Sequence, residues 1–99
     1  MNIVLDKKET LLTVFAEGSV DTVTAPELEE ALQKNWDGVL SLVLDFSKVE
    51  YISSAGLRVL MVANQHMEET DGNIVVKNVN EDVKEVFEMT GFDTLLNLE

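Results

Sequence analysis

The most constraining feature of this sequence is an almost uninterrupted apolar run near its middle. Residues 39–46 read Val-Leu-Ser-Leu-Val-Leu-Asp-Phe, and the stretches on either side repeat apolar residues at helical spacing. A strand of this kind has no polar face to turn toward water, so we expect it in the centre of a sheet and buried on both faces. The run therefore predicts an α/β fold.

Shorter strand-like and helix-like stretches alternate around this run. Two apolar segments, Ile3–Leu5 and Leu11–Ala16, are separated by polar residues and predict an antiparallel hairpin. The other expected elements are a loop over 17–23, a helix from Thr24 to about Trp36, a loop through Tyr51, a helix over 55–70, a strand over 74–76, a helix between Asn80 and Gly91, and a short strand over 95–98. This order predicts one domain over residues 1–99, with a mixed sheet of about four or five strands and amphipathic helices packed on it.

The start of the first helix carries a recognisable local signal. Thr24-Ala25-Pro26-Glu27 matches a capping box, in which the Thr24 hydroxyl caps the helix and Glu27 reaches back to the backbone. Pro26 fits the first turn, where no backbone N–H is required. We therefore expect Thr24 to be the side-chain cap.

Charge and composition exclude several classes of function. Seven Lys and Arg face nineteen Asp and Glu, a net charge of −12, so neither nucleic acid nor an anionic membrane is expected as a partner. The absence of cysteine excludes disulfides and thiolate-bound zinc, and no loop has the pattern of a calcium site, so no metal or cofactor is expected. No segment resembles a signal peptide or approaches the roughly 20 apolar residues of a membrane span, so we expect a cytoplasmic protein without membrane insertion.

The sequence offers no nucleophile and base that could form a catalytic pair. Ser54 is the only plausible nucleophile and His66 the only histidine, and both fall on one expected helix. At about 1.5 Å per residue they would lie roughly 18 Å apart, too far for a nucleophile and its base. Glycine-rich phosphate-binding motifs are also missing. We therefore expect a protein that is not an enzyme.

The most informative segment follows the apolar run. A short loop after Asp45 brings Ser53 and Ser54 to the start of the next helix, where free backbone N–H groups and the helix dipole favour a negative charge. A phosphate on a hydroxyl there would be tolerated by the fold. The alternative is that Ser54 serves only as the helix cap. Gly56 lowers helix propensity and would let a partner's backbone approach, so we expect its substitution to weaken binding more than folding.

This segment resembles the signature of the STAS domain, as found in bacterial anti-sigma factor antagonists. Leu44-Asp45-Phe46-Ser47 matches the end of the family's hydrophobic strand, and Ser54-Ala55-Gly56-Leu57 matches its phosphorylated serine two residues before Gly-Leu. The resemblance covers the whole chain, including Gly18-Ser19-Val20-Asp21 near the start and Thr90-Gly91-Phe92 near the end. Two positions depart from the pattern, since Ser53 stands where many members have Asp, and Ala55 where many have Ser or Thr.

The resemblance implies a regulatory substrate and adaptor. In that family the unmodified antagonist binds an anti-sigma factor that is also a serine kinase, which frees the sigma factor. The kinase then phosphorylates the antagonist, and a PP2C-type phosphatase reverses the modification. By the same resemblance Ser54 is the phosphorylated residue, with Ser53 as second choice, and the partner-binding residues are Asp21, Ser53, Ala55, Gly56, Leu57 and Arg58. For Asp21 the alternative is a turn residue in an ordinary loop.

Other functions of free-standing STAS domains stay open. One alternative is an accessory subunit of a lipid-transport ATPase, and another is a module that binds a nucleotide or other ligand without being phosphorylated. The Ser-Ala-Gly-Leu sequence at the helix start favours the antagonist, although the ATPase subunit also tolerates Ser or Thr there. Phosphate transfer from a cognate kinase would separate these classes.

Overall fold

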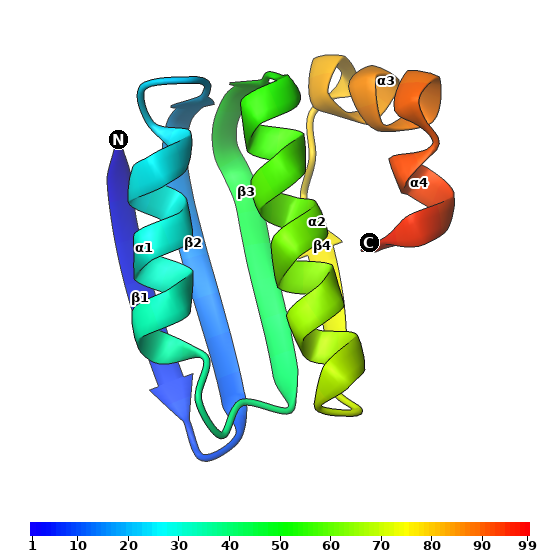
Figure 1. Cartoon of the computed structure of the whole chain (residues 1–99). Helices are drawn as coiled ribbons and strands as arrows, with labels where there is room; N and C mark the ends of the chain where they lie inside the picture. The colour runs from blue at the N-terminus through cyan, green and yellow to red at the C-terminus, as the bar shows by residue number, and fades with distance from the viewer.

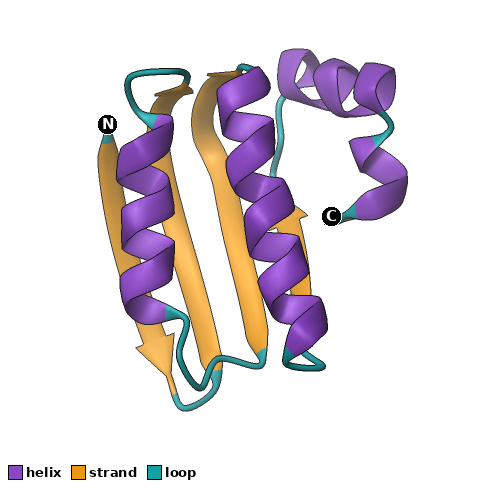
Figure 2. Ribbon diagram, in the orientation of Figure 1, coloured by secondary structure: helices purple, strands orange, loops and turns teal.

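The computed structural model describes residues 1–99 as nine elements of secondary structure (Figures 1 and 2). In chain order they are β1 (Asn2–Lys8), β2 (Leu11–Val20), α1 (Ala25–Asn35), β3 (Ser41–Ile52), α2 (Ser54–Glu69), β4 (Asn73–Lys77), α3 (Glu81–Thr90), α4 (Phe92–Leu95) and β5 (Asn97–Leu98). None of the helices combines the length and apolarity needed to cross a membrane.

The strands form one mixed sheet in the order β1-β2-β3-β4-β5. β1 pairs with β2 antiparallel, as the hairpin pattern predicts, and the other neighbouring strands are parallel. Figure 2 shows α1 and α2 side by side over one face of the sheet, with α3 and α4 beyond the β4 edge. The predicted α/β class, mixed sheet and packed helices are confirmed.

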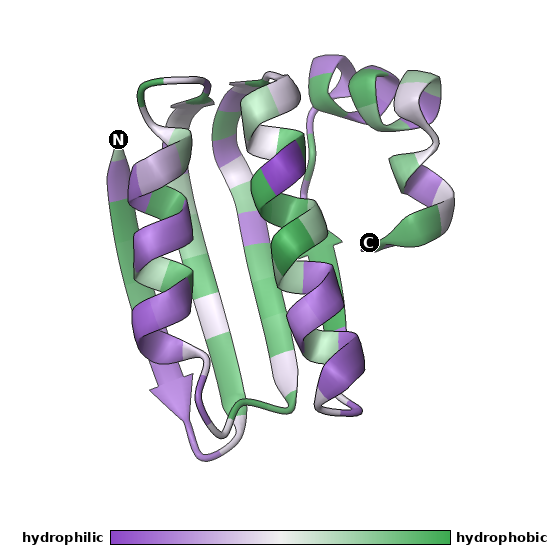
Figure 3. Cartoon of the chain, viewed as in Figure 1, coloured by the Kyte–Doolittle hydropathy of each residue, from purple (hydrophilic) through white to green (hydrophobic).

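The apolar run predicted to be central does form the middle strand of the sheet. Leu42, Leu44 and Phe46 of β3 are fully buried beneath the helices, and Figure 3 shows hydrophobic residues along this strand. On the opposite face Val43 is only half-buried, because no helix covers that side. The expected burial of both faces is therefore correct for the face that the helices cover and wrong for Val43 on the opposite face.

Two strands, β2 and β3, extend into segments that were expected to be loops. β2 continues to Val20 and β3 to Ile52, where loops over 17–23 and up to Tyr51 were expected. The two strands remain paired in parallel to their ends, through two register shifts that act as bulges. Gly18, with a φ of +107°, supplies a backbone conformation that other residues rarely adopt. Pairing between strands therefore overrides the local loop signals.

The C-terminal segment follows its local signals more closely. The Asn80 side chain accepts a hydrogen bond from the N–H of Val83 at 2.8 Å, and Gly91 ends α3 with a φ of +80°, as predicted. The expected last strand is shorter, because Leu95 belongs to α4 and only Asn97–Leu98 pairs with β4.

Candidate functional site

The candidate site lies at the end of the sheet where β2 and β3 finish. The loop that follows β2 and the start of α2 both lie at this end, at the top of Figure 1. The N–H of Ser53 donates to the carbonyl oxygen of Val20 at 2.8 Å, which joins the end of β2 to the start of α2. Segments that are distant in the sequence are thus held together by backbone hydrogen bonds.

The two serines of the motif occupy different environments. Ser53 is the N-cap residue of α2, and its side-chain oxygen is buried without a hydrogen-bond partner. Ser54 is the first residue of the helix and is exposed to solvent. The alternative in which Ser54 is the cap is therefore wrong, since the cap position belongs to Ser53. Of the two serines, Ser54 is the exposed residue, whereas the Ser53 hydroxyl oxygen is buried.

The first turn of α2 offers donors for an anion on Ser54. The first hydrogen bond within this turn runs from the N–H of Leu57 to the carbonyl oxygen of Ser53 at 3.0 Å. The N–H groups of the preceding helical residues have no partner inside the helix. Together with the helix dipole, these groups stabilise a negative charge at the helix start.

Gly56 does not face a partner, contrary to the expectation from sequence. It is buried, and a Cβ atom placed on it would lie 2.6 Å from Ile52 Cγ1 and 2.7 Å from Val20 Cγ1. The same Cβ would lie 2.9 Å from the backbone oxygen of Val20. The missing side chain lets the start of α2 approach the ends of β2 and β3. The expectation that Gly56 matters for binding more than for folding is therefore wrong in its premise.

The other expected contact residues divide between surface and interior. Leu57 is 7% exposed and belongs to the core, so its side chain also points away from the surface expected for it. Ala55 is half-buried and packs against the core, while Arg58 is exposed. Arg58 Nη2 lies 3.1 Å from Glu29 Oε1, an ion pair that links α2 to α1. The surface near Ser54 thus includes Ala55 and Arg58 but not Gly56 or Leu57.

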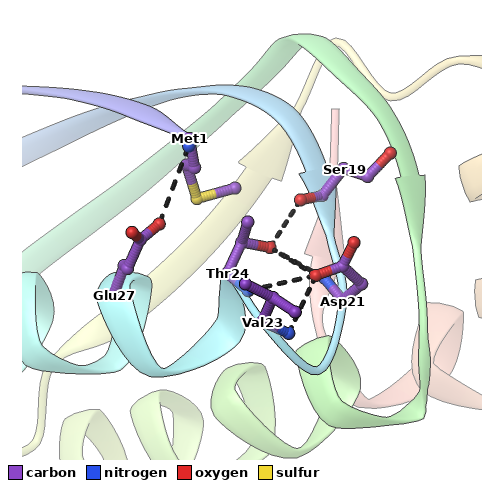
Figure 4. Close-up of polar contacts among 6 residues, drawn as sticks. All are labelled: Met1, Ser19, Asp21, Val23, Thr24 and Glu27. Carbon is purple, nitrogen blue, oxygen red and sulfur yellow. Dashed lines mark hydrogen bonds and ion pairs between the residues drawn. The ribbon is translucent and has the colours of Figure 1, made fainter.

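Asp21 organises the loop between β2 and α1 (Figure 4). Its Oδ1 atom accepts hydrogen bonds from the N–H groups of Val23 and Thr24, both at 3.0 Å. These backbone donors, that of Thr24 first, hold the pKa of Asp21 below its ordinary value of 3.8. Asp21 follows Val20, whose carbonyl oxygen is bonded to the N–H of Ser53, so its carboxylate places a negative charge at the end of the sheet where α2 begins.

The predicted capping box at Thr24 is wrong. Thr24 is the N-cap residue of α1, but its hydroxyl makes no capping bond to the helix. The hydroxyl instead donates to the carbonyl oxygen of Ser19 at 2.6 Å and accepts from the N–H of Asp21 at 2.9 Å. Glu27 does not reach back to Thr24 either, because its Oε2 atom lies 3.7 Å from the Met1 amino nitrogen (Figure 4). Thr24 ties the loop to β2, and the capping role falls to Asp21, whose carboxylate accepts from the N–H groups of Val23 and Thr24 while the Thr24 hydroxyl accepts from the Asp21 N–H.

Asp45, which the sequence pattern places at the end of a strand, is a buried carboxylate. It is 8% exposed and accepts hydrogen bonds from the Ser47 N–H at 3.0 Å and from Asn78 Nδ2 at 3.4 Å. Burial acts to raise the pKa of Asp45, but the hydrogen bonds from Ser47 and Asn78 and the charge of Lys77 outweigh it, so the pKa lies below 3.8. The bond to Ser47 falls at the first bulge between β2 and β3 and helps to hold it.

Asp45 should make the stability of the fold sensitive to acid. Its folded-state pKa is lowered, so the carboxylate stabilises the fold above the unfolded pKa and loses that contribution as pH falls through the folded value. We expect Asp45→Asn to lower the free energy of unfolding by about 1 kcal/mol at neutral pH. In urea unfolding at about pH 3, the free energies of unfolding of Asp45→Asn and the wild type should differ by less than at neutral pH. Asp6→Asn, at an exposed position of β1, is the matched control and should leave the free energy of unfolding unchanged at both pH values. A loss for Asp45→Asn that does not depend on pH would contradict the stabilising role of the Asp45 carboxylate.

The single histidine takes part in packing. His66 of α2 stacks on Trp36 at the end of α1, with ring centroids 3.9 Å apart and an interplanar angle of 8°. This contact joins the helices near the ends opposite the candidate site (Figure 1). No group of three or more His, Asp or Glu side chains is placed to hold a metal ion.

Comparison with known proteins gives a consistent assignment. A family profile described as the STAS domain matches residues 2–99. BtrV of Bordetella bronchiseptica, named as a candidate anti-sigma factor antagonist, is 36% identical over 93 residues, which cover 93% of this chain and 80% of BtrV.

Solved structures agree with this family profile. The crystal structure of an anti-sigma factor antagonist from Mycobacterium paratuberculosis has a TM-score of 0.87 at 28% identity, covering 98% of this chain and 83% of that one. The phosphorylated form of the Bacillus cell-fate determinant SpoIIAA shares the fold, with a TM-score of 0.77 at 13% identity over 99% of this chain and 91% of its own. The chain therefore belongs to the STAS domain family.

Proposed function

We propose that this protein is an anti-sigma factor antagonist whose binding is switched by phosphorylation of Ser54. In this proposal the unmodified chain binds an anti-sigma factor that is also a serine kinase, and so frees a sigma factor in the cytoplasm. The kinase then phosphorylates Ser54, which ends the complex, and a PP2C-type phosphatase restores the hydroxyl. The single observation that carries the proposal is the exposed Ser54 on the first turn of α2, beside a Ser53 whose hydroxyl oxygen is buried.

The chemistry expected of the chain is that of a phosphate acceptor. The Ser54 oxygen would form a bond to the γ-phosphorus of ATP, ADP would leave, and a base of the kinase would take the hydroxyl proton. The chain's own contribution is to present the hydroxyl on a rigid helix start and to stabilise the product with backbone N–H groups. The names of relatives support this role, because they describe anti-sigma factor antagonists and not catalysts.

Phosphate transfer distinguishes the two serines. We expect Ser54→Ala to abolish labelling by radioactive ATP, tested with each purified serine kinase of the anti-sigma class from the same genome. Ser53→Ala should keep most of the label, because the Ser53 oxygen is buried. Mass spectrometry of the labelled wild type would identify the residue independently.

Two outcomes would contradict this proposal in different ways. Label that is lost in Ser53→Ala and retained in Ser54→Ala would move the site to Ser53. No transfer to the wild type from any kinase of the panel would exclude the switch and favour the lipid-transport ATPase subunit or the ligand-binding module.

A further inference from the structure

Two exposed apolar side chains stand at the same end of the molecule as Ser54. Val23, in the loop before α1, is 77% exposed, and Tyr51, near the end of β3, is 50% exposed. Tyr51 pairs with Ser19 across the sheet, and the Ser19 carbonyl oxygen accepts the hydroxyl of Thr24, the residue after Val23. Backbone pairing and one side-chain hydrogen bond therefore bring these two positions together, although they lie on separate elements.

The structure holds both residues in place. The N–H of Val23 is bonded to Asp21 Oδ1, so the loop cannot turn freely to bury this side chain. Tyr51 lies within β3, and Ile52 beside it is fully buried. Valine has few rotamers and tyrosine has two side-chain torsions, so ordering them against a partner loses little entropy. Rigid, exposed, apolar side chains are what binding hot spots require.

The charges around these residues restrict what can dock there. Asp21 is negatively charged at neutral pH, with its pKa held below 3.8 by backbone hydrogen bonds from Thr24 and Val23, and Glu50 is exposed immediately before Tyr51. Arg58, the exposed cation of the first turns of α2, is paired with Glu29 at 3.1 Å. The whole chain carries a net charge of −12. A complementary surface must therefore be basic around an apolar centre.

We infer that Val23 and Tyr51 are the apolar anchors by which the serine kinase recognises this chain, and that they enter an apolar recess bordered by basic residues of the kinase. The inference rests on the proposed function and adds the chemistry of the partner surface to it. The anchors supply affinity and selectivity, while Ser54 supplies the group that is modified. Loss of an anchor should therefore raise the KM for phosphorylation and leave kcat nearly unchanged.

The chain offers matched controls for both anchors. Met89, near the C-terminal end of α3, is 78% exposed, and Leu40, before the start of β3, is 50% exposed, so each matches one anchor in exposure but belongs neither to the loop after β2 nor to the end of β3. Val23→Ala and Tyr51→Thr would be compared with Met89→Ala and Leu40→Ala. Threonine retains the strand propensity of position 51. Urea unfolding would establish that all four variants keep the wild-type stability.

Calorimetric titration with the kinase that labels Ser54 gives the decisive result. We expect each anchor variant to bind at least threefold more weakly, the double variant at least tenfold, and both controls as the wild type does. Raising the salt concentration should weaken wild-type binding, since the basic surface is screened. Equal affinities for anchor and control variants, or salt-independent binding, would overturn this inference alone. A wild type that binds no kinase of the panel would overturn the proposed function and this inference with it.

Discussion

Ser54→Asp is expected to weaken binding to the anti-sigma kinase at least tenfold while the fold keeps its stability. Ser54 is the first residue of α2 and is exposed, so a carboxylate there lies at the positive end of the helix dipole. Such a charge stabilises a helix by roughly 0.3–1 kcal/mol. The circular dichroism spectrum and melting temperature should therefore stay close to those of the wild type.

The loss of affinity follows from what happens at the interface. A kinase surface that contacts a neutral hydroxyl would have to desolvate or repel a carboxylate, and the authentic phosphate would add about −1.5 to −2 charges. Burying an unpaired charge costs several kcal/mol, and each roughly 1.4 kcal/mol changes the dissociation constant tenfold. The phosphorylated chain should therefore bind at least as weakly as Ser54→Asp.

A variant of nearly equal size separates charge from shape. Ser54→Asn has the volume of Ser54→Asp without its charge, and we expect it to bind within about threefold of the wild type. Calorimetric titration would measure the affinity of the kinase for the wild type, Ser54→Asp and Ser54→Asn. Undiminished affinity of Ser54→Asp would exclude the electrostatic switch. Affinity that is lost together with the circular dichroism signal would indicate an order–disorder mechanism instead.

Gly56→Ala is expected to destabilise the fold by about 2 kcal/mol, although alanine is the better helix former. Alanine gains about 1 kcal/mol of helix propensity over glycine, but overpacking a tight core costs typically 1–3 kcal/mol and occasionally more. At Gly56 the added methyl would meet the backbone oxygen of Val20 at 2.9 Å, which cannot move as a flexible side chain can. The crowding should therefore outweigh the gain in propensity.

Thermal and urea unfolding would measure this effect. For a domain of this size, a loss of about 2 kcal/mol corresponds to a decrease of roughly 10 °C in melting temperature. Ser54→Ala, in the same helical turn but exposed, is the control and should stay near the wild type. A Gly56→Ala variant that is as stable as the wild type or more so would show that α2 does not need this close approach to the sheet.

Local signals account for the parts of the fold that were predicted correctly. The cap at Asn80 and the stop at Gly91 each depend on a few neighbouring residues, and the structure has both. The central position of the apolar run was also predicted correctly, because a strand without a polar face has few other places in a fold. The family resemblance carried by the residues around Ser54 is confirmed by the profile that matches nearly the whole chain.

The errors arise where residues bond to partners outside the pattern that predicted them. Thr24 has the right sequence for a capping residue, but its hydroxyl donates to the Ser19 carbonyl oxygen and accepts from the Asp21 N–H once the loop folds back on β2. β2 and β3 extend beyond their apolar patterns because each supplies hydrogen-bond partners for the other. The Thr24 contacts lie within a short stretch of sequence, whereas the pairing of β2 with β3 joins segments far apart in the chain and is not visible in any window of neighbouring residues.

The sequence by itself determined the order and type of most elements, and it placed Ser54 at the start of a helix, because periodicity and end signals act over a few residues. Only the tertiary structure decided which serine is open to solvent and that Gly56 faces the core. It also decided that Val23 and Tyr51 stand at the same end as Ser54. Burial and proximity depend on contacts between residues far apart in the chain, such as Val20 with Gly56, and these contacts exist only after the sheet and helices have packed.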